Sequence, residues 1–422
     1  MLPKTLLTYG LGTALSVSLV TAARAETSIA DDVKFDWSTY GAVNLRQFEY
    51  FKNAQDTAPR TRRQTDLERL VFEPVLSFGK EWKLETEIEF EHGGTGSTLE
   101  FDGFSEFGEF ESEVEQGGEV RVEKFELKRI VDPDLNFRFG YITVPVGTIS
   151  QRHHPTEYFT ATRNRSEQKV LPSTWRSVGF GVTGRFLETW EYQFVVVQGL
   201  NSEFFRKYNW IQGGAKRAFE STYIDDVAGA LRLDWGSNKP YQKIGASFYY
   251  GNTSRNRMKT DKLSVDAGVM IADVHANWES ETWTMRALYL RGYLQNSEDV
   301  SNANATLGGA ANPGAFSALG KSAEVGFAEI GYNLQSAFPT MISERTDFYV
   351  RYDMVDPMKE TTGTIYSDPR YRETSWSTGL SYKPRSELVA KLQLSRIQSG
   401  FDAIPIQTEI LAGFGFYYST ED

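Results

Sequence analysis

Residues 82–91 read WKLETEIEFE, a run in which apolar and charged side chains alternate one by one. One face would carry Trp82, Leu84, Thr86, Ile88 and Phe90, and the other Lys83, Glu85, Glu87, Glu89 and Glu91. Successive side chains of a β-strand point to opposite faces, so this pattern predicts a strand with apolar surroundings on one side and water on the other. A soluble sandwich also contains such strands, so the prediction depends on how often the pattern recurs.

Sixteen segments with this period of two can be counted along the chain. They lie near residues 34–50, 66–79, 81–92, 119–130, 135–146, 175–186, 190–200, 223–236, 241–252, 264–278, 282–295, 323–335, 346–356, 372–383, 387–398 and 407–418. This number predicts an all-β protein, a transmembrane antiparallel β-barrel of 16 strands. The alternation is weakest in the tenth to twelfth segments, so 14 or 18 strands are the alternatives.

The connections between these segments alternate in length. After most even-numbered segments they are short, such as Gly79-Lys80 and Leu187-Glu188-Thr189. After odd-numbered segments they are mostly long, and the main ones span residues 51–65, 93–118, 147–174, 201–222 and 296–322. Short periplasmic turns and longer extracellular loops produce this alternation in outer-membrane barrels, which places both termini in the periplasm.

The first 25 residues predict export. Lys4 precedes the apolar run Leu6–Val20, and Ala23-Arg24-Ala25 matches the cleavage site of a secretory signal peptide, cut after Ala25. A membrane anchor is the alternative, but the run is short for one and is diluted by Gly, Ser and Thr. The expected organisation is a signal peptide at residues 1–25 and one barrel domain at residues 26–422, localised to a bacterial outer membrane.

The composition agrees with an exported barrel. The 422 residues include no cysteine, which excludes disulfide bonds, thiol catalysis and thiolate metal sites. Aromatic residues make up 14% of the chain, Gly occurs 36 times, and the formal net charge is −11. After the first 25 residues, no apolar run approaches the roughly 20 residues that a membrane helix needs.

Against this acidic background, the third long connection is basic. Its predicted pore-constriction residues are Arg152, His153, His154, Arg163, Arg165, Lys169 and Arg176, with only Glu157 and Glu167 as acids. Folded into a water-filled barrel, such a cluster would narrow the channel and concentrate anions. The two histidines would add charge only as the pH falls toward about 6.5. Pairing with the two glutamates is the competing interpretation for some of the arginines.

The lumen wall is expected to carry charges of both signs. Alternation places Arg46, Arg69, Glu85, Glu87, Glu89 and Arg138 on inward faces. Most of these side chains are expected to solvate the lumen, and the glutamates at positions 85, 87 and 89 would attract cations.

Motifs for catalysis or metal binding are missing. The sequence contains no G-x-S-x-G, H-E-x-x-H or P-loop pattern. His275 shares a predicted strand face with Asp273 and Asn277, but three lumen-facing polar residues give the same pattern. The adjacent His153 and His154 would point apart in an extended chain and chelate poorly. No catalytic residue, metal ligand or cofactor is therefore predicted.

Two parts of the chain resemble the phosphate-selective porin O and P family. In PVGTISQRHHPTEYFTATRNRSEQKVLPSTWRSVGFGVTGRF (residues 145–186), the shared pattern is Pro-x-Gly, then His-Pro-Thr-Glu, then Leu-Pro-Ser-Thr-Trp-Arg before a Gly-rich strand. RRQTDLERLVFEPVLSFGKEWKLETEIEF (residues 62–90) is similar to the early strands of the family. The likeness extends over roughly residues 60–200. It implies a 16-stranded barrel, usually a homotrimer, with an inward-folded third loop, that passes anions by diffusion.

These observations favour an outer-membrane porin for passive diffusion of small hydrophilic solutes, chiefly anions. Members of the resembled family that are specialised for phosphate line the pore with Arg and Lys, whereas this wall includes acids, so phosphate selectivity is not implied. The expected partners are outer-membrane lipid, the solutes and further copies in a homotrimer, and no nucleic acid. The alternatives are a structural or adhesive surface barrel with a closed pore and, less favoured, a barrel enzyme.

Overall fold

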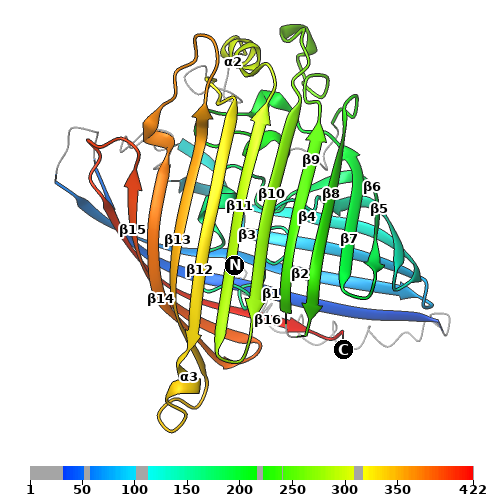
Figure 1. The fold of residues 1–422 in the computed structure, drawn as a ribbon, viewed down its shortest axis with the longest axis vertical. Helices are drawn as coiled ribbons and strands as arrows, with labels where there is room; N and C mark the ends of the chain where they lie inside the picture. Colours follow the sequence, from blue (N-terminus) through cyan, green and yellow to red (C-terminus); the bar gives the residue numbers. More distant parts are fainter. Residues whose placement is uncertain are drawn as a thin grey trace, which may run out of the picture.

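Sixteen antiparallel strands form a closed barrel in the computed structural model (Figure 1). The structure describes residues 32–51, 58–100, 113–215, 222–239, 241–307 and 317–421. Each strand pairs with its neighbours in sequence, and β1 (Val33–Tyr50) pairs with β16 (Gln407–Ser419) to close the ring. The predicted signal peptide and its cleavage after Ala25 lie outside the described residues.

The other fourteen strands follow the predicted order. They are β2 (Arg60–Phe78), β3 (Trp82–Glu100), β4 (Glu113–Asp132), β5 (Leu135–Thr143), β6 (Arg176–Phe186), β7 (Trp190–Gln198), β8 (Val227–Asn238), β9 (Tyr241–Gly251), β10 (Val269–Glu279), β11 (Trp283–Leu294), β12 (Ser322–Asn333), β13 (Arg345–Glu360), β14 (Glu373–Arg385) and β15 (Leu388–Ser399). The predicted count of 16 is therefore confirmed, including the tenth to twelfth strands, where the alternation is weakest.

Short helical segments occur only in connections of the described chain. The α-helices are α1 (Arg165–Gln168), α2 (Ser297–Ala305) and α3 (Leu334–Ala337), and the 3-10 helices are η1 (Ser202–Phe204), η2 (Gln212–Ala215), η3 (Thr260–Lys262) and η5 (Pro369–Tyr371). None of the helices in these ranges has the length and apolar character required to cross a membrane.

The alternating apolar and polar side chains of the strands face opposite sides of the barrel wall, with the apolar ones outward and the polar ones inward. On β1, Val43 and Leu45 are 43% and 59% exposed, whereas the side chain of Asn44 between them is buried. Large apolar side chains on most other strands are exposed in the same way, for example Ile244 and Trp376. Such an outer surface suits hydrocarbon, and closure leaves no strand edge with unpaired backbone groups.

The two ends of the barrel differ as the connection lengths predict. Turns after even-numbered strands are short, and the longest of them contains α3, which projects from one end (Figure 1). Long connections after odd-numbered strands gather at the opposite end, where α2 lies (Figure 1). This parity follows from antiparallel pairing of consecutive strands.

The hairpin of β3 and β4 is longer than predicted. Residues 93–118 were expected to form a loop, yet the ladder continues from Gly96 paired with Gly117 to Glu100 paired with Glu113. An irregularity in the ladder between Glu91 and Gly96 precedes this extension. Backbone hydrogen bonds between strands need no alternation of apolar and polar side chains. A Gly-rich stretch can therefore extend a strand pair even where the sequence shows no strand pattern.

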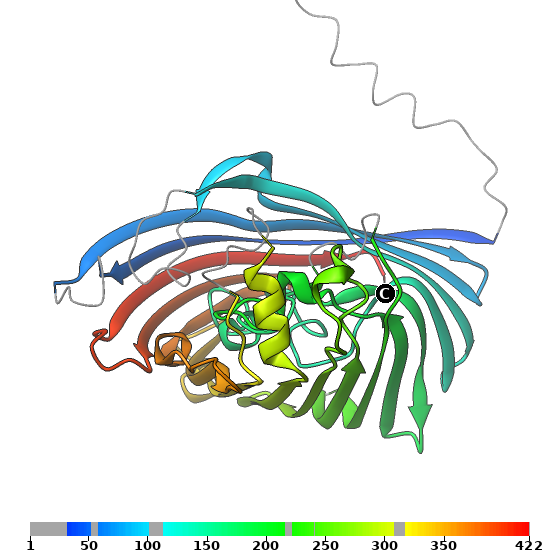
Figure 2. The same ribbon diagram turned by 90° about the horizontal axis from the view of Figure 1, so that it is seen from above.

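The connection between β5 and β6, residues 144–175, lies inside the barrel and is called the inner loop below. Seen from above, it forms a teal-green coil within the ring of strands (Figure 2). Its side chains and backbone contact β2, β8, β10, β13, β14 and β15 from within. The predicted inward folding of the third long connection is thus present in the fold.

Candidate functional site

The inner loop turns into the lumen at a glycine that the wall holds on both sides. Gly147 has φ +69°, a conformation that glycine adopts without the strain a Cβ would bring. Its N–H donates to Asp273 on β10 (3.0 Å), and its carbonyl oxygen accepts from Arg232 on β8 (2.6 Å). Two wall strands therefore fix the point at which the chain turns into the lumen.

Glu167 in α1 ties the far part of the inner loop to this turn. Its carboxylate accepts hydrogen bonds from the backbone N–H and the hydroxyl of Thr148, at 2.7 and 2.5 Å. The carboxylate is fully buried, and burial raises the pKa of Glu167, while the Thr148 hydrogen bonds act in the opposite direction. Glu167 and Thr148, both in the inner loop, thus form a brace that stabilises the loop without the barrel wall.

The middle of the inner loop spans the lumen. The N–H of Ala161 donates to Gln393 on β15 (2.8 Å), and the Ser166 hydroxyl donates to Asp353 on β13 (2.8 Å). Lys391, also on β15, donates from Nζ to the carbonyl oxygen of Thr160 (2.9 Å). Because the loop starts at β5 and ends at β6, these contacts show that it reaches the opposite wall.

Aromatic side chains anchor the inner loop at two places. Phe159 stacks on Tyr349 of β13 with centroids 5.4 Å apart and an interplanar angle of 10°. A Cβ on Gly331 would collide with the Phe159 ring, so this glycine makes room for it. Trp175 packs against Tyr249 of β9 at 4.7 Å. Packing, rather than contact with solutes, is therefore what these rings do.

The predicted constriction cations are each paired with a carboxylate. Arg152 contacts Glu157 at 3.1 Å and Glu279 on β10 at 2.9 Å. Arg163 contacts Glu68 on β2 at 3.5 Å. The wall, much more than the loop itself, supplies these acids.

Glu373, the first residue of β14, forms ion pairs with two basic residues of the inner loop. Its two carboxylate oxygens lie 2.7 Å from Arg165 and 2.9 Å from Lys169. Arg165 also lies 3.8 Å from Glu409 on β16. Burial lowers the pKa of Lys169 and outweighs the opposing effect of Glu373, and Arg165 lowers it further.

The last predicted constriction residue, Arg176, is the first residue of β6 and is almost completely buried. It donates to Glu87 at 2.5 Å and lies 3.7 Å from Glu123. It therefore belongs to the wall next to the inner loop.

The two adjacent histidines occupy different environments. His153 is buried, and burial together with neighbouring positive groups holds its pKa well below the usual range. This lowered pKa argues against the expected gain of charge near pH 6.5. His154 is half-buried and stacks on Tyr417 of β16, with centroids 4.3 Å apart.

The predicted lumen-wall residues all take part in ion pairs across the inner face. Arg46 pairs with Glu409, Arg69 with Glu89 at 3.6 Å, Glu85 with Lys124 and, at 2.7 Å, with Lys128, Glu87 with Arg176, and Arg138 with Glu126 at 2.7 Å. The glutamates at positions 85, 87 and 89 are thus not a free acidic ladder, because basic residues of β2, β4 and β6 face them.

Sequence reasoning missed the acids that pair with the inner loop. Glu68, Glu279, Glu373 and Glu409 lie on strands far away in sequence. The signal available was alternation, since Glu409 precedes Leu411 on an inward-facing row of β16. Alternation identifies the face of a residue, but only the closed barrel identifies its partner.

Two cavities flank the middle of the inner loop. The larger has a volume of about 530 Å³, and the described residues lining it include five basic and five acidic side chains. The smaller has a volume of about 70 Å³, with six basic and two acidic side chains in its lining. Thr160, Arg163 and Arg351 line both cavities and therefore lie between them.

The His275 cluster is a closed network of hydrogen bonds in the wall. One ring nitrogen lies 2.7 Å from Asp273 and the other 2.8 Å from Asp234. The neighbouring Ser247 hydroxyl donates to Asp273 and not to the imidazole. A nucleophilic serine needs the imidazole as its base, so this cluster holds Asp273 toward Gly147 and forms no catalytic triad.

Comparisons with known proteins agree with the fold. No protein-family model matches this chain. An uncharacterized protein of Aquifex aeolicus is 23% identical over 338 residues, 78% of this chain and 70% of that protein.

Among solved structures, the anion-selective porin of Comamonas acidovorans has a TM-score of 0.52 at 8% identity, with 92% of this chain and all of the porin covered. OmpF of Salmonella typhi, solved in complex with daunomycin, gives 0.54 at 10%, with coverage of 92% and 98%. The outer-membrane channel DcaP of Acinetobacter baumannii gives 0.50 at 11%, with coverage of 92% and 97%. At these identities, the likeness shows the fold alone, namely the barrel that this chain shares with these proteins.

Proposed function

We propose that this protein is a bacterial outer-membrane porin through which small hydrophilic solutes diffuse passively. The observation that carries the proposal is the closed 16-stranded barrel with an apolar exterior and a polar inner loop spanning its lumen. The porin fold shared with the anion-selective porin and with OmpF supports it. The function needs no catalytic residue and no cofactor, and the proposal excludes enzymatic activity.

In this proposal, the mature barrel domain consists of residues 26–422, after cleavage of the signal peptide at residues 1–25. The mature protein is expected to begin at Glu26 and to fractionate with the outer membrane. N-terminal sequencing of the mature band tests both expectations, and a retained Met1 would contradict them. The barrel is further proposed to assemble as a homotrimer, as the family resemblance implies, which native mass spectrometry in detergent tests.

Within this function, we infer that the inner loop sets a weak preference for anions. Each loop cation has a carboxylate partner, so the field of the cluster is much smaller than five free charges would give. The smaller cavity nevertheless has six basic side chains against two acidic ones. Charges in a narrow passage are screened less than charges at the mouth, where the Debye length is about 8 Å at physiological salt. The local excess can therefore outweigh the negative net charge of the chain.

Planar-bilayer recording of the purified protein tests the channel and its selectivity. The wild type is expected to conduct and to show a zero-current potential of anionic sign across a salt gradient. Arg163→Glu combined with Arg165→Glu should make the preference neutral or cationic. Arg185→Glu with Arg385→Glu is the matched control, because these exposed arginines pair with acids of the short turns and undergo the same charge change. No conductance at all would favour the closed surface barrel instead.

A further inference from the structure

Three histidine clusters in the described chain differ in what their ring nitrogens contact. His275 uses both nitrogens in hydrogen bonds, and His92 faces Asp66 at 2.8 Å, with both side chains lining the larger cavity. His153 is 92% buried, and neither of its ring nitrogens has a hydrogen-bond partner. A buried polar group without a partner requires an explanation, and a missing ion is one of the recognised ones.

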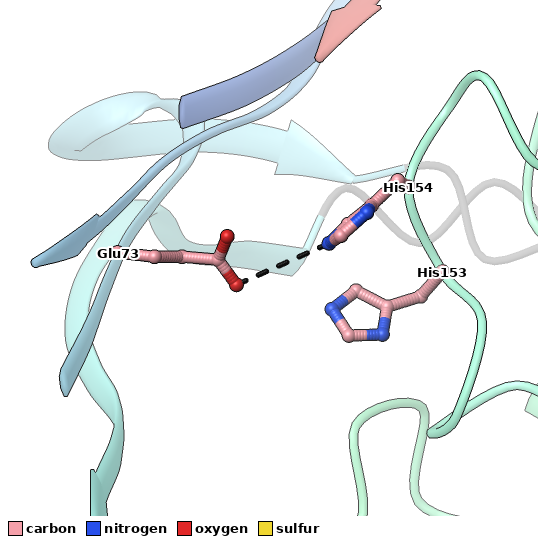
Figure 3. A group of neighbouring side chains, drawn as sticks. All are labelled: Glu73, His153 and His154. Carbon is pink, nitrogen blue, oxygen red and sulfur yellow. Dashed lines mark ion pairs between the residues drawn. The ribbon is translucent and has the colours of Figure 1, made fainter. Parts of the chain in front are cut away.

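Three possible ligand atoms of this cluster lie close together. A ring nitrogen of His153, a ring nitrogen of His154 and a carboxylate oxygen of Glu73 all lie within 4.8 Å of one another. Both rings extend from the inner loop toward Glu73 on β2 (Figure 3). The sequence-based expectation that adjacent histidines point apart holds for extended chain, whereas the chain bends here and the ring centroids lie 5.1 Å apart.

We propose that Glu73, His153 and His154 form a site for a divalent transition-metal ion of the Zn²⁺ class. Two imidazoles and one carboxylate are a ligand set that zinc accepts, with water in the fourth position. Metal–ligand bonds of about 2.0–2.2 Å place tetrahedral ligand atoms roughly 3.3–3.6 Å apart, so the three donors, which lie within 4.8 Å of one another, would move closer on binding. Glu73 and His154 are half-buried, and their side chains remain accessible from the lumen at 20% and 23%.

The surroundings already hold the ligands in place. Ser38 donates to one carboxylate oxygen of Glu73, and the other lies 4.0 Å from Nε2 of His154. The opposite ring nitrogen of His154 lies 3.7 Å from Glu157, whose carboxylate also accepts the His154 N–H at 3.1 Å. A carboxylate behind a ligand histidine fixes its ring and raises its basicity, as in many zinc sites.

Three arginines lie near His153, namely Arg69, Arg163 and Arg176, but each is paired with a glutamate, which offsets its charge and permits a cation. Arg69 donates to the His153 carbonyl oxygen at 2.5 Å, and Glu89 lies 3.6 Å from its guanidinium. Glu73 accepts a hydrogen bond from the Ser38 hydroxyl, and its basic neighbour is His154 at 4.0 Å, so its negative charge is available to the metal. A bound ion would join the inner loop to β2 and thereby fix the part of the loop that precedes the lumen crossing.

Metal binding is measurable on the full-length barrel in detergent, independently of any conductance. Isothermal titration with ZnCl₂ is expected to give one site per chain, and Co²⁺ should acquire the visible absorption of a tetrahedral N,O complex. Glu73→Gln and His154→Gln should each weaken Zn²⁺ binding at least tenfold and abolish the Co²⁺ spectrum.

His92→Gln is the matched control, because His92 also faces a carboxylate but is not among the residues of the triad. It should leave the affinity and the spectrum unchanged. Circular dichroism and heat-modifiable migration verify that each variant is folded. Absence of Zn²⁺ binding in the wild type, or binding that survives both Glu73→Gln and His154→Gln, would overturn the proposal.

Discussion

At the scale of single residues, Lys391 shows how the wall holds the inner loop. Its Nζ is buried, donates to the Thr160 carbonyl oxygen at 2.9 Å and lies 3.6 Å from the centroid of the Tyr158 ring. An ammonium over an aromatic face is attracted by the ring quadrupole, and its hydrogen bond is stronger than a neutral one. One side chain therefore fastens two successive parts of the loop.

Replacing this lysine is expected to loosen the inner loop without unfolding the barrel. Lys391→Met keeps the apolar stem but leaves the Thr160 carbonyl without its donor, at a local cost of about 1–3 kcal/mol. Amide hydrogen exchange of peptides covering residues 155–165 should accelerate about tenfold or more. Lys34→Met is the control, since that side chain is 66% exposed and pairs with Asp36 at 3.1 Å, which is worth little. Equal exchange in all three proteins would contradict the fastening role.

Lys169 makes the proposed selectivity dependent on pH. Its pKa is lowered by burial and further by Arg165, against the effect of Glu373, so it loses its proton below the usual lysine value of about 10.4. As the pH rises through that lowered pKa, the site loses positive charge while Glu373 keeps its own. The zero-current potential should therefore move toward cation preference as the pH is raised toward the usual lysine value.

Lys169→Arg distinguishes the contribution of Lys169 to the pH dependence from that of every other group that titrates in the alkaline range. An arginine retains its charge at pH 10, so the shift should shrink in the variant. The same shift in both proteins would assign the pH dependence to other side chains.

In each ion pair of the inner loop, the sequence allowed the basic residue to be predicted but not its acidic partner. The loop cations cluster within residues 152–176, so a local window reveals them. Glu373 lies more than 200 residues from Arg165, and no local pattern joins them. The His153–His154 pair illustrates the same limit, because ring direction depends on a bend that the sequence does not specify.

At the scale of elements, the inner loop depends on the turn at Gly147. Gly147→Ala places a Cβ in a left-handed conformation, at about 1–2 kcal/mol, and drives it into the Glu167 carboxylate. The brace between Glu167 and Thr148 should break, which should lower the unfolding temperature and expose the loop to exchange. Gly229→Ala on β8 is the control, because the nearest atom to its Cβ would be 4.0 Å away and its backbone is extended. Similar losses in both variants would show that the turn has no special role.

Strands were predictable where one face is apolar, and less so elsewhere. β15 alternates plainly because hydrocarbon and lumen impose opposite demands on its two faces. The ends of β3 and β4 continue beyond that pattern, where backbone pairing alone defines the ladder. Register and bulges, such as the one between Ala42 and Val43, follow from closing the ring.

At the scale of the whole molecule, charge is arranged in pairs across the lumen. The chain has a net charge of −11, yet the larger cavity is lined by equal numbers of basic and acidic side chains. The electric field of a charged side chain falls off over a shorter distance when an opposite charge lies beside it. The net charge of the chain therefore says little about which ions pass. Selectivity should then respond as strongly to removing an acid as to removing a base.

Glu373→Gln is the direct test of this balance. It leaves Arg165 and Lys169 without their shared carboxylate, while Glu409 stays 3.8 Å from Arg165. The channel should become more anion-selective, which is opposite to the effect of Arg163→Glu with Arg165→Glu. Glu360→Gln makes the same change of charge in an exposed pair with Arg291 and should leave the zero-current potential nearly unchanged, because solvent screens it within about 8 Å. If Glu373→Gln and Glu360→Gln shift the potential equally, the ion pairs of the inner loop do not govern permeation, and long-range charge does.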